Sequence, residues 1–201
     1  MPIPCLALEL AGTIRHDGSG GVADDLSDRA GLALWLGDRA ERLAAAGCTE
    51  AGPVTEPLHA RVLAVRGALR ALLARAVSPA PPSPADADRL LPAERALELL
   101  NAAAADRPVV PVLDWPAGAA PVVRVRVVGD AAGGLPAALA RAAIDFLAGP
   151  DLPRLRACTA PRCVRYFLQE HGRQEFCKAS CGNRARAARH YRRHHAASEA
   201  D

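Results

Sequence analysis

Apolar residues recur at intervals of three and four in several long stretches of the chain. In residues 58–77 they form a continuous stripe made up of Leu58, Val62, Val65, Leu69, Leu72 and Ala76. This spacing places the apolar side chains on one face of an α-helix. Four helices are therefore predicted, over residues 27–46, 58–77, 92–105 and 135–147. Ser27 is the expected N-cap of the first helix and Gly47 its end.

The period changes between the last two of these helices. Residues 109–113 (VVPVL) and 121–128 (PVVRVRVV) are typical of two strands joined by a turn, so one β-hairpin is predicted. Residues 5–14 form a short buried element whose type, strand or helix, the pattern leaves open. The Gly- and Asp-rich residues 15–26 are predicted to be a loop. Proline at four of eight positions makes residues 78–85 a semi-rigid linker.

Gly149, Pro150 and Pro153 mark a break after the last predicted helix. The 201 residues suffice for one ordinary domain and a small appendage. About 50% of the residues are hydrophobic, which is enough for a buried core. The predicted fold class is α+β and mostly α. It comprises a helical domain with one β-hairpin at residues 1–150, followed by a small cysteine-rich unit at residues 151–201.

Four of the six cysteines lie in this last unit, with the spacing C-x4-C-x13-C-x3-C. Two close pairs separated in this way are typical of a tetrahedral zinc site with four thiolate ligands. One zinc ion per chain is predicted, with the ligands Cys158, Cys163, Cys177 and Cys181. The gap between the pairs leaves room for a hairpin whose first arm is residues 164–169. The second pair opens a helix, with Ser180 as its cap, so a treble-clef-like zinc finger ending in a basic helix is expected.

Other uses of the four thiols stay open at this point. The sequence has no recognisable secretory signal or membrane span, so a cytoplasmic location is expected, and that compartment is reducing. Disulfides are therefore disfavoured, and a thiol redox site usually needs one pair rather than two. An iron–sulfur cluster fits the spacing less well than zinc. Cys5 and Cys48 lie far from the tail and are expected to be small buried hydrophobes.

Positive charge is concentrated in the same segment. Residues 158–195 carry nine Lys/Arg and two Asp/Glu, whereas residues 1–157 carry sixteen Arg and eighteen acids. At 100° per residue, the helix after the cysteines has an expected inward face made up of Arg184, Ala188, Tyr191 and His195. The opposite face, the basic stripe, consists of Arg186, Arg189, His190 and Arg193. This stripe is the predicted nucleic-acid contact, with a solvated face or a protein contact as the alternatives.

The letters CGNR at residues 181–184 complete a known signature. With the LALEL…LALWL opening, the two cysteine pairs and the run CGNRARAARHYRR, they make the chain resemble the CGNR zinc-finger proteins, whose N-terminal part is called the ABATE domain. The resemblance covers nearly the whole chain and implies four cysteine zinc ligands at the positions named above. Gly182, Asn183 and Arg184 are expected to be structural residues around the zinc.

Two positions depart from the pattern of that family. Members often have Trp before the third cysteine and four residues between the last pair, where this chain has Phe176 and three residues. An Asn-Thr pair common near the N-terminus stands here as Gly12-Thr13. The first change leaves a workable zinc site, whereas the second removes support for any ligand role borrowed from that region.

The resemblance implies a bacterial transcription regulator, described in some members as stress-induced. The favoured hypothesis is a zinc-containing, DNA-binding regulator in which residues 1–150 sense a small-molecule effector or dimerise, with RNA as an alternative partner. A homodimer is considered because so small a zinc unit offers little contact area for specific binding. The rival hypothesis is a protein-docking module built on the zinc finger.

An enzyme is not expected from this sequence. The candidate acids and bases Asp24, Asp25, His16 and His59 are scattered, and neither a phosphate-binding loop nor a nucleophile–base arrangement is recognisable.

Overall fold

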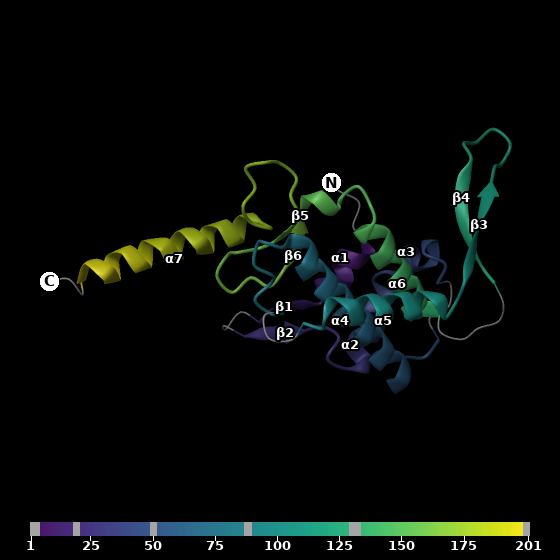
Figure 1. Ribbon diagram of the computed structural model, residues 1–201, viewed down its shortest axis with the longest axis horizontal. Helices are drawn as coiled ribbons and strands as arrows, with labels where there is room; N and C mark the ends of the chain where they lie inside the picture. The colour runs from purple at the N-terminus through teal and green to yellow at the C-terminus, as the bar shows by residue number, and fades with distance from the viewer. Residues whose placement is uncertain (1–4, 18–20, 49–51, 87–89, 129–133, 199–201) are drawn as a thin grey trace.

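The computed structural model describes residues 5–17, 21–48, 52–86, 90–128 and 134–198, with side chains described up to residue 192. The elements are, in chain order, α1 (Leu6–Ala11), β1 (Ile14–His16), β2 (Val22–Asp24), α2 (Arg29–Gly37), α3 (Ala40–Ala45), α4 (Glu56–Val77), α5 (Ala93–Ala105), β3 (Val109–Asp114), β4 (Val122–Val127), α6 (Gly134–Leu147), the 3-10 helix η1 (Leu152–Arg154), β5 (Leu155–Ala157), β6 (Tyr166–Leu168) and α7 (Ala179–Ser198) (Figure 1). The strands of the described part pair as three two-stranded antiparallel sheets, β1–β2, β3–β4 and β5–β6. The predicted class, α+β and mostly α, is confirmed.

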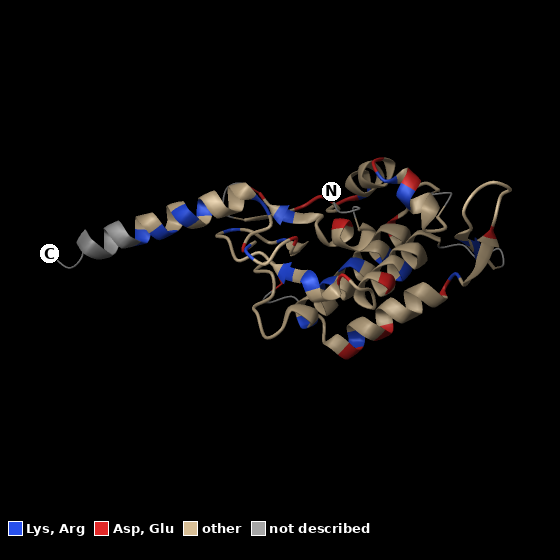
Figure 2. Cartoon of the chain, turned by 90° about the horizontal axis from the view of Figure 1, so that it is seen from above, with Lys and Arg blue, Asp and Glu red and all other residues tan. Residues whose placement is uncertain are grey.

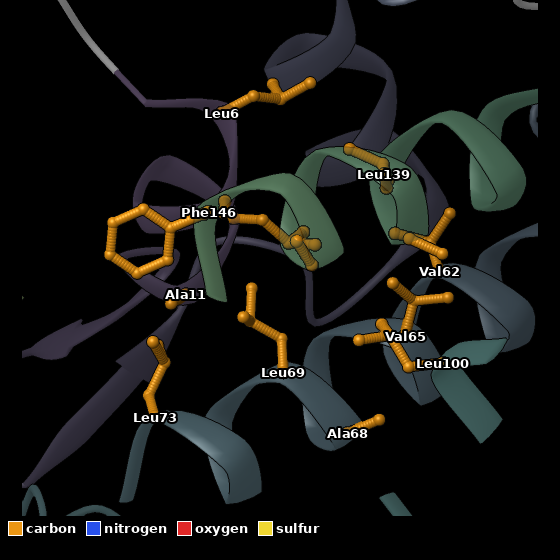
Figure 3. Packing of buried hydrophobic residues seen from close by; sticks show 14 of the residues in the cluster. Leu6, Ala11, Val62, Val65, Ala68, Leu69, Leu73, Leu100, Leu139 and Phe146 are labelled. Carbon is orange, nitrogen blue, oxygen red and sulfur yellow. The ribbon is translucent and has the colours of Figure 1, made fainter. Parts of the chain in front are cut away.

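The main core lies where α4, α5 and α6 pack against one another and against α1. Figure 3 shows side chains from all four helices converging there, among them Leu6, Leu69, Leu100, Leu139 and Phe146. Most of the core is built from Leu, Val and Ala, as the low aromatic content required. Truncating a fully buried leucine such as Leu69 to alanine would cost about 2–5 kcal/mol.

Helix α4 confirms the longest predicted stripe and extends it at the N-terminus. It begins at Glu56 because the Thr55 side chain accepts a hydrogen bond from the Leu58 backbone N–H at 3.3 Å. The predicted β-hairpin is also confirmed, as β3 paired with β4 in a register that sets Pro111 opposite Val125.

The single helix predicted over residues 27–46 is wrong, because the chain forms α2 and α3 with a break between them. The N-cap is Asp28 rather than Ser27, since the Asp28 carboxylate accepts from the Gly31 N–H at 2.7 Å. At the break, Arg39 has a non-helical φ of −126°. Its guanidinium lies 4.7 Å from the Trp35 ring centre and forms a 2.9 Å ion pair with Glu9 of α1. These tertiary contacts fix Arg39 where local propensity alone would continue the helix.

The opening segment combines a helix and a strand. Residues 6–11 form α1, and Ile14 then starts β1, which pairs with β2 inside the region predicted to be a loop. These strands have only three residues each and include Arg15, Ala23 and Asp24, so they lack the apolar alternation that predicts a strand. The β1–β2 hairpin is held in place by an ion pair between Asp24 of β2 and Arg66 of α4.

Two elements project from the body at opposite ends of the molecule. Helix α7 extends away as a single rod at one end, and the β3–β4 hairpin stands out at the other (Figures 1 and 2). Within the described residues no helix combines the length and the apolar character that a membrane span requires. Most of the described side chains of α7 are exposed to solvent.

Candidate metal centre and basic helix

The four predicted cysteine ligands meet at one point, where β5, β6 and α7 come together. Cys158 directly follows β5, Cys163 lies in the turn before β6, and Cys177 and Cys181 flank the start of α7. The turn between the first pair closes through a 2.9 Å bond from the Cys163 N–H to the Ala160 carbonyl. The sulfur atoms of all four cysteines lie within 4.8 Å of one another.

The sulfur positions fit a zinc ion. A tetrahedral site with Zn–S bonds of about 2.3 Å places its sulfurs roughly 3.8 Å apart. The Sγ of Cys177 lies 3.7 Å from that of Cys163 and 3.5 Å from that of Cys181. Three of the four cysteines are buried and all four lack a disulfide partner, so the donor set is complete without water and suits a structural metal.

Thiols this close must share protons unless a cation neutralises them. Hydrogen bonds from Cys163 and Cys177 lower the pKa of the Cys158 thiol. The same contacts with Cys158 raise the pKa of Cys163 and that of Cys177. A divalent metal ion removes this conflict, because it favours the thiolate form of every ligand.

Two donors outside the ligand set act on the sulfurs. The Cys177 backbone N–H points to Cys158 Sγ at 3.5 Å, and Arg184 Nη2 donates to Cys181 Sγ at 3.1 Å. Arg184 is half-buried, so its charge partly offsets that of four thiolates around one zinc. The prediction that Arg184 turns inward is therefore confirmed.

The rest of the predicted inward face is only partly correct. Ala188 is half-buried, but Tyr191 is 64% exposed, and the structure instead buries Ala185. The reason is that α7 projects from the body, so the later turns of its inward face are more open to solvent than the first (Figure 1). His195 lies outside the residues whose side chains are described.

The basic stripe is exposed where the structure describes it. Arg186, Arg189 and His190 are all exposed, and Arg186 Nη2 donates to the Asn183 side-chain oxygen. Arg193 belongs to α7, but its side chain lies outside the described residues. Arg192, which belongs to neither predicted face, is also exposed. Gly182 is buried against the Phe176 ring, with 3.5 Å between that ring and the place a Cβ would occupy.

Two local predictions in the zinc unit are wrong. Residues 164–169 were predicted to be the first arm of a hairpin lying between the two cysteine pairs. Instead, β6 pairs antiparallel with the preceding strand β5, placing Tyr166 opposite Ala157. Ser180 does not cap the last helix, since α7 begins at Ala179 and Cys181 N–H bonds to the Lys178 carbonyl at 3.0 Å. The knuckle, sheet and helix of a treble-clef-like unit are nevertheless all present.

A buried ion pair connects the zinc unit to the helical body. Arg70 of α4 is 3% exposed and donates through Nε and Nη2 to the two carboxylate oxygens of Asp86, at 2.7 and 3.0 Å. The Tyr166 hydroxyl donates to Asp86 at 2.8 Å, and the Ser83 hydroxyl donates to the Val164 carbonyl at 2.9 Å. Val164 directly follows the ligand Cys163. The zinc knuckle is thus hydrogen-bonded to α4 through the segment that contains Ser83 and Asp86.

Sequence reasoning missed this network. The proline-rich stretch was predicted to be a semi-rigid linker, yet Ser83 is fully buried and Asp86 is 4% exposed. Helical periodicity placed Arg70 beside the apolar stripe of α4 and not within it, so its burial with a carboxylate partner had no clear signal in the sequence. Nothing in the sequence indicated that the partner lay sixteen residues ahead, at Asp86.

Two family models match successive parts of the chain. Residues 5–150 match the family model ABATE, described as "Putative stress-induced transcription regulator". Residues 154–194 match the model of the CGNR zinc finger. A search of curated proteins found no match. The zinc-finger match and the four clustered thiols together identify the metal as one zinc ion.

Proposed function

Because the chain belongs to the ABATE family and ends in a CGNR zinc finger, we propose that it is a transcription regulator that binds DNA through α7. The zinc site orients the helix, and the exposed arginines contact the phosphates. The domain of residues 5–150 senses an effector or pairs two copies. The protein acts in the cytoplasm, where its thiolates stay reduced.

The observation that carries this proposal is the charge of α7. The helix contains five arginines and three histidines and has no acidic residue. In Figure 2 the described part of α7 carries blue and no red. Arg186 and Arg189 are exposed on it three residues apart, with the exposed His190 beside them, so the two guanidinium groups place positive charge on one face of the helix. A surface of this kind neutralises phosphates and releases counterions, which is the main source of affinity for DNA.

The shape of the molecule favours the same function. Helix α7 projects from one end of the molecule, so a DNA major groove about 12 Å wide can admit its exposed face. A rigid zinc site at its base holds the helix direction, which lowers the entropy lost on binding. One helix buries little DNA surface, so specific recognition requires two copies of the chain on adjacent half-sites.

Binding, rather than catalysis, also agrees with the groups in the body. Asp24 forms a two-point ion pair with Arg66, and the His59 Nε2 lies 2.8 Å from the Leu26 carbonyl oxygen. Both side chains therefore serve the packing of the β1–β2 hairpin against α4.

The test is binding of labelled duplex DNA to the zinc-loaded protein over a series of salt concentrations. We compare wild type with Arg186→Ala/Arg189→Ala and with the control Arg124→Ala/Arg126→Ala, which removes the same charge from the β3–β4 hairpin. Loss of two phosphate contacts should lower the slope of log affinity against log salt by about 2, and only in the first variant.

Two results would count against the proposal. Equal losses in both variants would mean that only net charge matters, and no binding at low salt would leave protein docking as the function of α7. Duplex RNA is added as a competitor. Displacement of DNA by RNA at equal concentration would assign the helix to RNA instead.

A further inference from the structure

A cavity of about 480 Å³ lies beside α4, away from the zinc site. One side is formed by the β1–β2 hairpin, with Ile14 and Val22, and the other by Pro84, Ala85 and Leu90. Cavities that bind small molecules usually measure about 300–1,000 Å³. The size therefore suits one small organic molecule.

Gly67 forms part of the cavity wall in the middle of the 22-residue helix α4. Glycine inside a helix destabilises it by about 1 kcal/mol relative to alanine. This glycine is helical, and a Cβ built on it would meet no atom of the described residues within 4 Å, so its backbone does not require a glycine. What the missing side chain leaves is space on the cavity side of the helix.

The charged side chains in the cavity wall are paired with one another. The four charged residues among its described lining form two ion pairs, Arg66 with Asp24 and Arg70 with Asp86. The Arg70–Asp86 pair and Arg66 are buried, whereas the Asp24 side chain is 34% exposed, so one pair is shielded from water and the other is partly open. An ionic ligand would lose its hydration here without gaining an unpaired counter-charge. An uncharged ligand pays no such penalty and can pack on Leu63 and Leu90.

We propose that this cavity binds a small uncharged molecule with an apolar, ring-sized body and one hydrogen-bonding group. The body packs on Leu63, Pro84 and Leu90, and the polar group meets the edges of the Arg66–Asp24 and Arg70–Asp86 pairs. Gly67 leaves the room that the ligand fills.

The same cavity is coupled to the zinc finger. Arg70 and Asp86 line it and also hold Val164 and Tyr166, since Arg70 Nη2 lies 3.4 Å from the Val164 carbonyl and Tyr166 donates to Asp86. A ligand that shifts this ion pair therefore shifts the zinc knuckle and the base of α7. The regulatory part of this inference rests on the proposed DNA-binding function, whereas the site itself does not.

The test uses three probes with the same ring: phenol, benzoate and benzylamine, which are neutral, anionic and cationic at pH 7. Each is titrated into the zinc-loaded full-length protein while backbone amide signals are followed by NMR. Phenol should give saturable shifts at Leu63 and Gly67, and the two ions should bind at least about tenfold more weakly because they must be desolvated.

Variants locate the binding. Gly67→Leu fills the space and should weaken phenol binding at least about tenfold, whereas Ala60→Leu, at an exposed position of α4, should leave it unchanged. Gly67→Ala adds one methyl group, should raise the stability of the helix, and should weaken binding less than Gly67→Leu does. If Gly67→Leu does not fold, Gly67→Ala still carries the test.

Several outcomes overturn the proposal. These are the absence of saturable shifts at Leu63 and Gly67, unchanged phenol binding in Gly67→Ala and Gly67→Leu, or benzoate binding as tightly as phenol. Coupling between the cavity and the zinc finger is measured separately. Phenol should shift the Val164 amide signal in wild type but not in Tyr166→Phe, whereas the shift at Leu63 should remain in both proteins. These readouts need no DNA, so failure of DNA binding would leave the result for the cavity intact.

Discussion

The guanidinium of Arg184 donates a hydrogen bond from Nη2 to the Sγ of the zinc ligand Cys181 at 3.1 Å. Two residues further along α7, Arg186 turns outward and is exposed. The same helix therefore carries arginines of two kinds. One belongs to the metal site, and the others form the surface that we assign to DNA, so mutation can separate the two.

Arg184→Met should weaken zinc binding by about 10–100-fold, because it removes the donor that stabilises the Cys181 thiolate. DNA binding should then fail at limiting zinc and recover when zinc is added in excess. Competition with a chromophoric chelator measures the zinc affinity. The control Arg186→Ala should keep wild-type zinc affinity, and an Arg184→Met protein that does the same would show that this bond has no effect on the metal.

Arg70→Met should destabilise the protein by about 3–5 kcal/mol, because it leaves the buried carboxylate of Asp86 without its counter-charge. Replacing both residues, as Arg70→Met/Asp86→Leu, should recover a large part of that loss. Urea unfolding of the zinc-loaded protein measures both changes. The exposed pair Arg95–Glu98 is the matched control, and breaking it should change stability by no more than about 0.5 kcal/mol.

Asp24 should make the stability of the fold sensitive to acid. Burial alone would raise the pKa of Asp24, but the hydrogen bond and charge of Arg66 outweigh it and lower the pKa below its ordinary value of 3.8. A carboxyl group with a depressed folded-state pKa stabilises the fold above its unfolded pKa, and this contribution is lost as pH falls through the folded-state value.

Wild type should therefore lose more stability than Asp24→Asn when pH falls from 6 to 3, as measured by urea unfolding at each pH. Asp38→Asn, which alters a carboxylate whose side chain is 80% exposed, serves as the control. Equal acid sensitivity of wild type and Asp24→Asn would contradict the role given to the Arg66 pair.

The features that sequence predicted well depend on local spacing. The stripe from Leu58 to Ala76 determines α4, and the intervals between the cysteines determine the zinc site, because both need only residues that are close along the chain. The errors arise where a contact between residues far apart in the sequence determines the local structure. The ion pair of Arg39 with Glu9 helps to end α2, and the Tyr166 hydroxyl donates to Asp86, which lies 80 residues away in the chain.

Tyr191 shows a different limit of sequence reasoning. Helical periodicity gives the face on which a residue lies, but it does not say how far the body extends beneath that face. Because α7 extends beyond the helical body, Tyr191 is exposed although it lies on the same side of the helix as Ala188. The length of a projecting helix relative to its support is a property of the tertiary structure alone.

We assign DNA binding to the zinc-oriented helix α7. The most direct measurement is an NMR titration of the zinc-loaded protein with a short duplex DNA at low salt, following the backbone amide signals of the whole chain. We predict shifts that cluster between Ala185 and Arg192 and disappear in Arg186→Ala/Arg189→Ala. Shifts that cluster on the β3–β4 hairpin instead, or no shifts at all, would contradict the claim.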